Sequence, residues 1–491
     1  MNWTKCIPNN QKGRFYVDWK KLYDDVDQWA ADHRQEFIDD ISEVCRIRSV
    51  SIMNKQDPEK PFGAACRQML DKALEMSTRY GFETRNYDNF CGSAVYGSNP
   101  DNDSIGIFSH MDIVPEGEGW THDPFDPILS EDGKYLFARG TADNKSCGIM
   151  AMYAMRYLKE HNIKLKNNVM LVFGLNEEIG MNDIPEFLAR EKCPKFSLVP
   201  DAKYPITYAE KGITKSVLKS PKMTGNLKDM WSGLAVNAGS PIAWAVLEGV
   251  SVKDAEKALE KFEKTSVEEV ECGVKITVEK DENKVIRDPI GTWTATARLC
   301  KVLAGSGLLT GNAQEVLDWM ADVSDDYRGE KIGIACNDEP NGPLRCSFNM
   351  IRMEEGRICF YPDIRYPSLA DQNKVLSGIK AAWAASPMEL ESFSNLDPFY
   401  ISLDNPFAQK LIEVARDALE QPDIEPLKDG GTYARRLPNA VPYGATVPGR
   451  VRLFGFAKGG AHQADEYCDI PNLLLNMRVY VRALIELDQM L

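Results

Sequence analysis

The residues of this chain that could do chemistry are histidines and carboxylates at the ends of apolar runs. His110 closes one apolar run, Glu178 follows a second and Asp201 follows a third. Buried strands that stop at charged residues place those residues along one edge of a sheet, where open α/β sheets bind ligands. Imidazole nitrogens and carboxylate oxygens are donors that zinc and manganese accept in proteins. The pattern therefore predicts a metal site at the edge of a sheet.

Two further side chains complete the predicted ligand set. Asp143 lies between the first two runs, and His462 follows a Gly-Ala pair near the end of the chain. If Asp143 bridges two ions about 3.5 to 4 Å apart, His110 and Asp201 can hold one ion while Glu178 and His462 hold the other. We expect two divalent ions, zinc in the first place and manganese or cobalt as alternatives, because these metals share the same ligands.

Two carboxylates next to these ligands are suited to assist hydrolysis. Glu177 adjoins a predicted ligand, so it is placed to take a proton from a water shared by the ions and to pass it to a leaving amine. Asp112 lies two residues beyond His110, on the same side of an extended segment, and can accept the imidazole N–H. We predict Glu177 as the catalytic base and Asp112 as the residue that fixes the tautomer of His110.

The elements that must position these side chains follow from hydrophobic periodicity. Apolar residues recur at helical spacing over residues 18–47 and again over 146–160. Short strand-like runs stand directly before the predicted metal ligands. This alternation of helix and strand indicates an α/β domain.

A second region begins at residue 212 and ends near residue 403. There, strand-like runs mix with helices, two of which are predicted at 241–248 and 251–262, as in an α+β domain. The region is an insertion, because a helix and the segment with His462 follow it. We predict a catalytic α/β/α domain from residues 1–211 and 404–491, with an inserted α+β domain at 212–403.

Composition excludes several classes of protein. The chain has 491 residues, of which 43% are hydrophobic and 27% charged, as in globular proteins. Its net charge of −15 argues against a nucleic-acid surface, and no apolar run approaches the roughly eighteen residues of a membrane span. The N-terminus lacks the basic start and apolar core of a secretion signal, and the 12 cysteines form no Cys-x-x-Cys pair. We expect a cytoplasmic protein with reduced cysteines that binds a small substrate, not nucleic acid or a membrane.

At these residues the sequence resembles a family of dinuclear-metal exopeptidases and deacylases. The family includes carboxypeptidase G, aminoacylase, succinyl-diaminopimelate desuccinylase and the PepV-like dipeptidases. The motifs that carry the resemblance, in chain order, are Ser109-His110-Met111-Asp112, Arg139-Gly140-Thr141-Ala142-Asp143, Glu177-Glu178-Ile179-Gly180, Pro200-Asp201-Ala202, Gly430-Gly431-Thr432 and Ala461-His462. The long insertion and the run His462-Gln463-Ala464-Asp465-Glu466-Tyr467 favour the PepV-like branch.

The resemblance implies a function for most of the chain. It implies a catalytic domain with two metal ions, a lid domain formed by the insertion, and hydrolysis of a dipeptide next to its free carboxylate, in a monomer or a homodimer. We also predict Asn237, Arg365, Gly431 and Thr432 as substrate-binding residues, with Arg365 able to bind a carboxylate or to form an ordinary ion pair. Three alternatives stay open: an N-acyl amino acid deacylase or carboxypeptidase, a peptide-binding relative without turnover, and, least favoured, a cysteine hydrolase acting through Cys147.

Two departures from the family pattern bear on activity. Asn144 stands where family members usually have an aspartate after the bridging carboxylate, which predicts a tuned site with its ligand intact. The family's lid also carries a histidine that stabilises the oxyanion formed during hydrolysis, but the insertion of this chain contains no histidine. The alignment puts about Val285 in its place, and Arg287 or Asn237 can substitute. Losing one oxyanion donor costs on the order of a hundredfold in rate.

Overall fold

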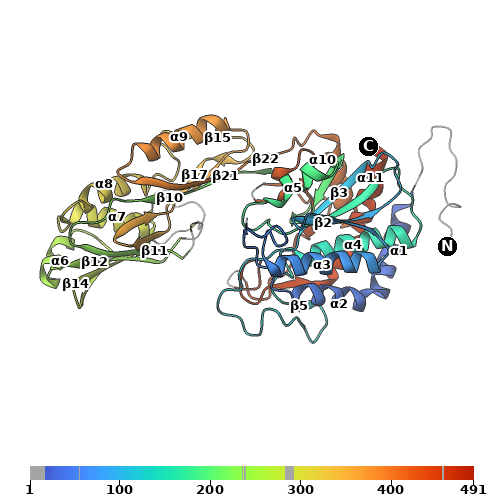
Figure 1. Ribbon diagram of the computed structural model, residues 1–491, viewed down its shortest axis with the longest axis horizontal. Coiled ribbons are helices and arrows are strands. Elements are labelled where there is room, and N and C mark those ends of the chain that lie inside the picture. The colour runs from blue at the N-terminus through green and yellow to red at the C-terminus, as the bar shows by residue number, and fades with distance from the viewer. Residues whose placement is uncertain are drawn as a thin grey trace. The chain divides into compact units, whose positions relative to one another are not determined.

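The chain folds into two units, and the predicted metal ligands all belong to the first. The computed structural model describes residues 17–54, 56–234, 236, 239–281, 292–428, 430–455 and 458–491. The first unit comprises the chain up to Tyr208 together with Ile401–Leu491, and the second comprises Ala209–Tyr400 (Figure 1).

The first unit is built on a six-stranded sheet in which β3 occupies an inner position. The strands follow the order β1 (Glu83–Tyr87), β2 (Cys91–Tyr96), β6 (Asn168–Gly174), β3 (Ser104–His110), β7 (Phe196–Val199) and β24 (Ala440–Pro442). β6, β3, β7 and β24 run parallel, whereas β2 pairs antiparallel with both of its neighbours. Every residue of β3 and β6 is buried, as expected of parallel strands covered on both faces. The segments that follow β3, β6 and β7 therefore meet at one edge of the sheet.

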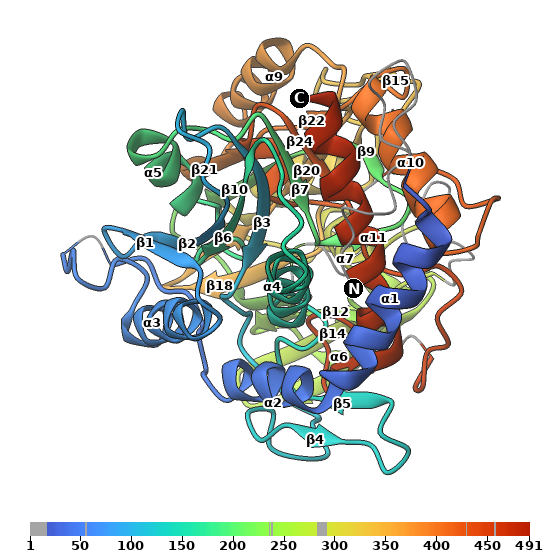
Figure 2. The same cartoon turned by 90° about the vertical axis from the view of Figure 1, so that its right-hand side faces the viewer.

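Helix α4 (Lys145–Glu160) is the central helix of this unit. It contacts β3, β6 and the C-terminal helix α11 (Ile470–Met490), and α4 lies on the opposite side of the sheet from α5 (Asp183–Arg190) (Figure 2). On the α5 side, Phe108 of β3 packs edge-on against Phe187, with ring centroids 5.3 Å apart. The other helices of the unit are α1 (Trp19–Asp32), α2 (Arg34–Cys45), α3 (Ala64–Arg79), α10 (Pro406–Ala418) and the short 3-10 helix η2 (Tyr433–Arg436).

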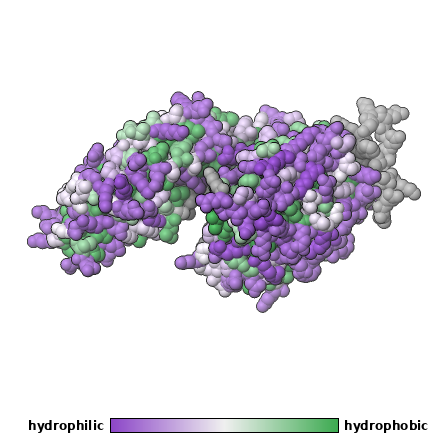
Figure 3. All heavy atoms as spheres, in the orientation of Figure 1, coloured by the Kyte–Doolittle hydropathy of each residue, from purple (hydrophilic) through white to green (hydrophobic). Residues whose placement is uncertain are grey.

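The visible surface of the first unit is mainly hydrophilic, with small hydrophobic areas between hydrophilic ones (Figure 3). This surface agrees with the 27% of residues that are charged. Among the helices that the structure describes, none combines the length and the apolar content needed to cross a lipid bilayer.

In its described residues, the second unit contains a large antiparallel sheet and four α-helices. Its strands are β10 (Gly212–Lys219), β11 (Leu227–Ser232), β12 (Ile242–Glu248), β13 (Thr265–Val270), β14 (Gly273–Glu279), β17 (Arg345–Ser347), β18 (Ile351–Glu354), β19 (Arg357–Phe360), β20 (Asp363–Tyr366) and β21 (Glu389–Leu396). Its helices are α6 (Val252–Leu259), α7 (Ala295–Ser306), α8 (Ala313–Val323) and α9 (Gln372–Ala384). Short strands elsewhere in the chain are β4 (Ile128–Leu129), β5 (Tyr135–Phe137), β8 (Ala202–Lys203), β9 (Thr207–Glu210), β15 (Asn337–Asp338), β16 (Gly342–Pro343), β22 (Phe399–Tyr400), β23 (Leu427–Lys428), β25 (Ala445–Thr446) and β26 (Tyr467–Asp469).

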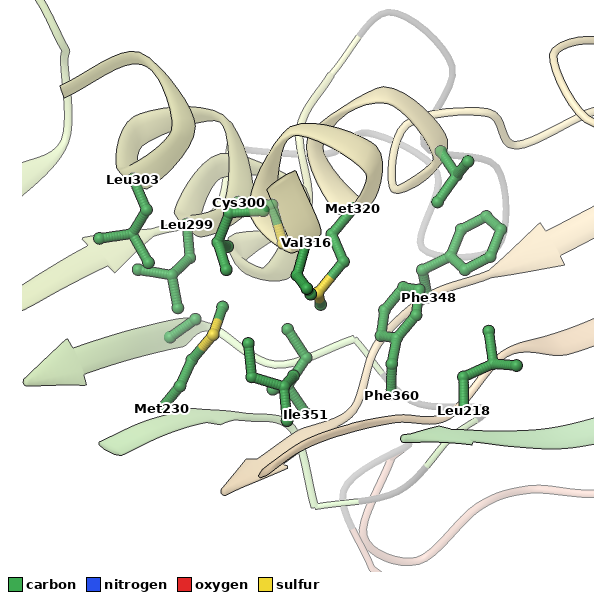
Figure 4. Packing of buried hydrophobic residues seen from close by; sticks show 14 of the residues in the cluster. Leu218, Met230, Leu299, Cys300, Leu303, Val316, Met320, Phe348, Ile351 and Phe360 are labelled. Atoms are coloured by element: carbon green, nitrogen blue, oxygen red, sulfur yellow. The ribbon is translucent and has the colours of Figure 1, made fainter. Parts of the chain in front are cut away.

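The core of the second unit lies between this sheet and the helices. Met230 and Ile351 project from strands toward Leu299 of α7 and Met320 of α8 (Figure 4). All four side chains are fully buried. Burying a side chain of this size stabilises the fold by roughly 1.5 to 3 kcal/mol, so the second unit has a hydrophobic core of its own.

The structure corrects one predicted element of this unit and confirms another. Residues 241–248 do not form the predicted helix, because Ile242–Glu248 is strand β12, paired antiparallel with β11 and β14. Its side chains alternate between buried and exposed or partly exposed, but both sets are apolar up to Glu248, so the period of two is hidden in the sequence. The helix predicted at 251–262 is confirmed as α6, where the hydroxyl of Ser251 accepts a hydrogen bond from the Asp254 amide at 3.1 Å.

Asp183, at the start of α5, ties the end of β6 to the 3-10 helix η2. Its fully buried Oδ2 accepts hydrogen bonds from the backbone amides of Leu175 at 2.7 Å and Asn176 at 3.1 Å, and from the hydroxyl of Tyr433. Burial raises the pKa of Asp183 to about 6, although these hydrogen bonds oppose the shift. The segment directly before Glu177 is therefore held by one buried carboxyl group.

The raised pKa predicts how Asp183 contributes to stability at different pH values. The folded protein binds this proton more tightly than the unfolded chain, so the contribution is complete below about pH 4 and is lost as the pH rises through about 6. The shift corresponds to about 3 kcal/mol. The free-energy difference between wild type and Asp183→Asn, measured by urea unfolding, should change by about this amount between pH 4 and pH 7. A difference that is constant with pH would contradict the assignment.

Candidate metal centre

Asp143 has the central position among the predicted ligands, because its two carboxylate oxygens face different histidines. Oδ1 lies 3.0 Å from Nε2 of His110, and Oδ2 lies 3.0 Å from Nε2 of His462. Burial acts to raise the pKa of Asp143, but hydrogen bonds to the two imidazoles lower it below the usual range. The carboxylate is therefore ionised and oriented to bridge two positive charges.

The remaining predicted ligands lie on either side of Asp143. Nε2 of His110 lies 3.7 Å from Oδ2 of Asp201, and Nε2 of His462 lies 3.1 Å from Oε2 of Glu178. Donor atoms bound at 2.0 to 2.2 Å around one tetrahedral zinc ion are about 3.4 Å apart. The hydrogen bonds to Asp143 and Glu178 also raise the pKa of His462 to about 10, so the site favours positive charge. The spacing and charge of this donor set fit two adjacent divalent cations.

Parallel β topology explains how distant segments reach this position. His110 is the last residue of β3, Glu178 lies in the turn after β6, and Asp201 follows β7. The carboxyl ends of these strands share one edge of the sheet. Asp143 lies just before α4, and His462 comes from the loop before β26, where its φ of 63° places it in the left-handed region.

Asp112 contacts both His110 and the segment that carries Glu177. Nδ1 of His110 lies 3.0 Å from the backbone carbonyl oxygen of Asp112 and 3.4 Å from its carboxylate, so the carbonyl is the nearer acceptor. The buried carboxylate accepts hydrogen bonds from the backbone amides of Glu177 and Glu178, both at 3.1 Å. Asp112 therefore connects the segment of His110 to the segment that carries the predicted base.

Glu177 lies beside the ligand cluster. A carboxylate oxygen of Glu177, an imidazole nitrogen of His110 and a carboxylate oxygen of Asp201 all lie within 4.8 Å of one another. Burial, reinforced by the neighbouring carboxylates, raises the pKa of Glu177 well above its usual value, while His110 opposes the shift. A carboxyl group with a raised pKa next to a cation site is suited to accept and release a proton near neutral pH.

The amide of Asn144 has a role that a carboxylate could not have. Its Nδ2 donates hydrogen bonds to the Pro200 carbonyl oxygen at 2.7 Å and to Oδ1 of Asp201 at 3.3 Å, and its Oδ1 accepts one from the Ser109 hydroxyl. The side chain is buried. An ionised aspartate at this position has no proton to donate, so the departure from the family pattern serves to orient Asp201.

Glu466 is a functional candidate that the sequence analysis missed. Its buried Oε1 accepts hydrogen bonds from the backbone amides of Gly140 at 3.1 Å, Ala142 at 2.8 Å and Asp143 at 3.1 Å, and its Oε2 accepts one from buried Arg139. Burial raises the pKa of Glu466 to about 7, and Arg139 opposes this shift. The carboxylate thus connects the segment of His462 to the loop that carries Asp143. The sequence signal for this ion pair was that Arg139 and Glu466 each lie inside a motif that also carries a predicted metal ligand.

Lys145 anchors the other end of the same loop. Its buried Nζ donates hydrogen bonds to the carbonyl oxygens of Val44 at 2.9 Å and Ile47 at 2.7 Å, at the end of α2. Burial lowers the pKa of Lys145 to about 8. The loop that carries Asp143 is therefore held from both sides.

The predicted substrate-binding residues belong to different parts of the chain. Gly431 and Thr432 precede Tyr433, whose ring centroid lies 6.3 Å from that of His110. Arg365 belongs to the second unit, where its Nε donates to Asp363 at 3.2 Å. Asn237, and with it Val285 and Arg287, lies outside the described residues.

The cysteine alternative is not supported by the geometry. Cys147 is buried in α4, and burial raises the pKa of its thiol to about 12. A thiol with this pKa is protonated at neutral pH, and the thiolate is the nucleophilic form. The sulfur therefore lacks the activation that a cysteine hydrolase requires.

Replacing Glu466 should loosen the metal centre without removing a ligand. Glu466→Gln leaves the Arg139 guanidinium buried without its counter-charge, so the free energy of unfolding should fall by about 3 kcal/mol. Zinc affinity, measured by calorimetry, should weaken by roughly tenfold to a hundredfold. Glu118→Gln, which removes an exposed carboxylate, is the matched control and should change neither quantity. Unchanged zinc affinity in Glu466→Gln would show that the contacts of Glu466 do not support the predicted metal ligands.

Comparison with known proteins places these residues in a family. Residues 106–486 match peptidase family M20/M25/M40. The chain is 31% identical over 471 residues to "Putative dipeptidase YtjP" of Bacillus subtilis (strain 168), covering 92% of this chain and 97% of that protein. It is 28% identical over 478 residues to the Beta-Ala-Xaa dipeptidase of Lactobacillus delbrueckii subsp. lactis, covering 93% and 97%.

A solved structure supports the fold. The crystal structure of human carnosine dipeptidase 1 aligns with 95% of this chain and 100% of its own, with a TM-score of 0.57 and 17% sequence identity. An identity this low shows the fold alone, and it confirms the predicted α/β fold class. The family match extends from within β3 to within α11 and includes all five predicted metal ligands. The predicted resemblance is confirmed, and the chain belongs to peptidase family M20/M25/M40.

Proposed function

We propose that the protein is a metal-dependent dipeptidase that hydrolyses the amide bond next to a free carboxylate. The observation that carries this proposal is the position of Asp143 between the Nε2 atoms of His110 and His462, at 3.0 Å from each. This geometry suits a carboxylate that bridges two ions, and Glu177, which lies close to His110 and Asp201, is suited to act as the base. Relatives with dipeptidase names that match nearly the whole chain support the same substrate class.

Different residues of the chain have different roles in hydrolysis. Bound divalent ions would supply Lewis acidity that polarises the scissile carbonyl and acidifies the attacking water. Glu177 accepts the proton of that water and then transfers it to the leaving amine, for which a raised pKa is an advantage. Asp112 holds the backbone amides of Glu177 and Glu178, so that base and ligand keep a fixed separation. Asn144 orients Asp201 in the same way.

The identity of the metal and the cellular compartment belong to the same proposal. We propose zinc first, with manganese or cobalt as alternatives, since mixed imidazole and carboxylate donors suit all three. The cysteines that the structure describes are all free thiols, most of them buried, which supports a reducing compartment such as the cytoplasm.

Activity should depend on added metal and on a free substrate amine. Protein stripped with a chelator should not hydrolyse Ala-Ala, and zinc, manganese or cobalt should restore hydrolysis. N-acetyl-alanine and N-acetylated Ala-Ala should be cleaved at least about tenfold more slowly, because the relatives with named substrates are dipeptidases. Faster cleavage of the acylated compounds would favour a deacylase or carboxypeptidase. Binding of two ions without turnover would instead favour the peptide-binding alternative, given the absence of a histidine from the insertion.

Glu177 and Asp143 should have separable roles. Glu177→Gln should lower kcat by about a hundredfold to ten-thousandfold while keeping its bound metal, because it removes a proton acceptor. Asp143→Ala should lose both metal and activity, because it removes the atom pair shared by the two sites. Elemental analysis of each purified variant, run beside dipeptide assays, measures both properties. Loss of metal in Glu177→Gln would make Glu177 a ligand and would remove it as the base.

A further inference from the structure

A pocket lies on the first unit directly beside the candidate metal centre. Its volume is about 360 Å³, within the range of about 300 to 1,000 Å³ typical of small-molecule sites. Asp143, Asn144 and Asp201 form part of its lining, together with β8, β25 and residues 447–450, 452, 455 and 458–461 of the chain segment before His462. A substrate held at the metal ligands can therefore extend a group into this pocket.

The lining of this pocket is positively charged, in contrast to the rest of the chain. Four of the residues that line it are cationic, namely Lys203, Arg450, Arg452 and Lys458. The carboxylates among the described lining residues are Asp143 and Asp201, whose charge bound cations would neutralise. The whole chain has a net charge of −15, so the charge of the pocket lining is opposite in sign to that of the chain as a whole. A concave site with one sign of charge concentrates ligands of the opposite sign.

Two of the cations are held in position by the protein. Nη2 of Arg450 donates a hydrogen bond to the Tyr467 carbonyl oxygen at 3.0 Å, and the guanidinium carbon lies 4.4 Å from the centroid of the Tyr467 ring. Nζ of Lys458 donates to Gly119 and to the Asp465 carboxylate, both at 3.0 Å, so part of its charge is already neutralised. Arg450 is therefore a preorganised donor for an anion.

Lys203 connects the pocket to the metal ligands. It lies two residues after Asp201, in strand β8, which pairs in parallel with β25 of the pocket wall. Its side chain is exposed and lines the pocket. Arg452 is also exposed and also lines the pocket. The cations thus come from two separate segments that face the same volume.

We propose that this pocket is a subsite for an acidic side chain, so that the enzyme prefers dipeptides that contain glutamate or aspartate. The proposal rests on the proposed dipeptidase function and specifies its substrate class. A carboxylate that enters the pocket forms ion pairs with these cations, whereas an amide of the same shape carries no charge and forms only hydrogen bonds with them. Glutamine is therefore the matched comparison for glutamate.

The preference is measured with pairs of dipeptides that differ only in this group. The metal-loaded protein is assayed with Glu-Ala against Gln-Ala and with Ala-Glu against Ala-Gln, which also finds the position of the acidic residue. We expect kcat/KM to favour glutamate over glutamine by about tenfold or more in one of the pairs. The preference should shrink as sodium chloride is raised, because exposed charges are screened.

Variants test whether the pocket causes the preference. Lys203→Met and Arg450→Met should each reduce the glutamate-to-glutamine ratio by about threefold to tenfold. Lys20→Met, which removes an exposed lysine on α1 outside the pocket, is the control and should keep the wild-type ratio. A preference that survives in both pocket variants would overturn the assignment of the pocket.

Failure of the subsite and failure of the proposed function have different outcomes. If the wild-type protein hydrolyses the glutamate and glutamine dipeptides equally, the subsite is wrong and the dipeptidase function stands. If it hydrolyses neither these four nor Ala-Ala, the function is wrong. The subsite is then tested by calorimetry, which measures binding of the glutamate and glutamine dipeptides to the zinc-loaded protein. Tighter binding of the glutamate dipeptide supports the subsite, and equal binding of the two overturns it.

Discussion

The candidate metal centre depends on one carboxylate, that of Asp143, being held between two imidazoles. An ionised carboxylate that is largely shielded from water is costly unless positive groups or hydrogen-bond donors compensate it. Here His110 and His462 compensate the side chain, and Glu466 accepts a hydrogen bond from the Asp143 amide. Because the two histidines are far apart in sequence, the compensation exists only when the N-terminal and C-terminal parts of the first unit are assembled.

Buried carboxylates that accept backbone amides recur around this centre. Asp112 accepts hydrogen bonds from two backbone amides in the turn after β6, and Asp183 accepts hydrogen bonds from two amides in the same turn. Glu466 accepts hydrogen bonds from three backbone amides in the loop before α4. Each one fixes a loop that would otherwise be free to move at the sheet edge. Loops that carry ligands need such support, because an error of about 1 Å in a ligand position costs much of the affinity or rate.

The sequence predicted the composition of the site better than its supporting contacts. His110, Asp143, Glu178, Asp201 and His462 could be selected because each belongs to a motif with an ordered place in the chain, and the structure brings their side chains together. Their roles as ligands remain a prediction, as does the assignment of Glu177 as the base. Glu466 was missed because the hydrogen bonds of a carboxylate to distant backbone amides leave no local pattern. The strand at Ile242–Glu248 was predicted as a helix for a related reason, since apolar residues on both faces of β12 hide its period.

By itself, the sequence determined the α/β class, the family and the types of side chain available for chemistry, because these depend on residue identity and local order. Only the tertiary structure decided which donors face each other, since His110 and His462 are joined through Asp143 by contacts that no local spacing specifies. It also decided that the amide of Asn144 orients Asp201 and that cations from two segments line one pocket. Charges and hydrogen-bond donors act through distances in space, and those distances are set by the packing of strands and loops that are remote in the chain.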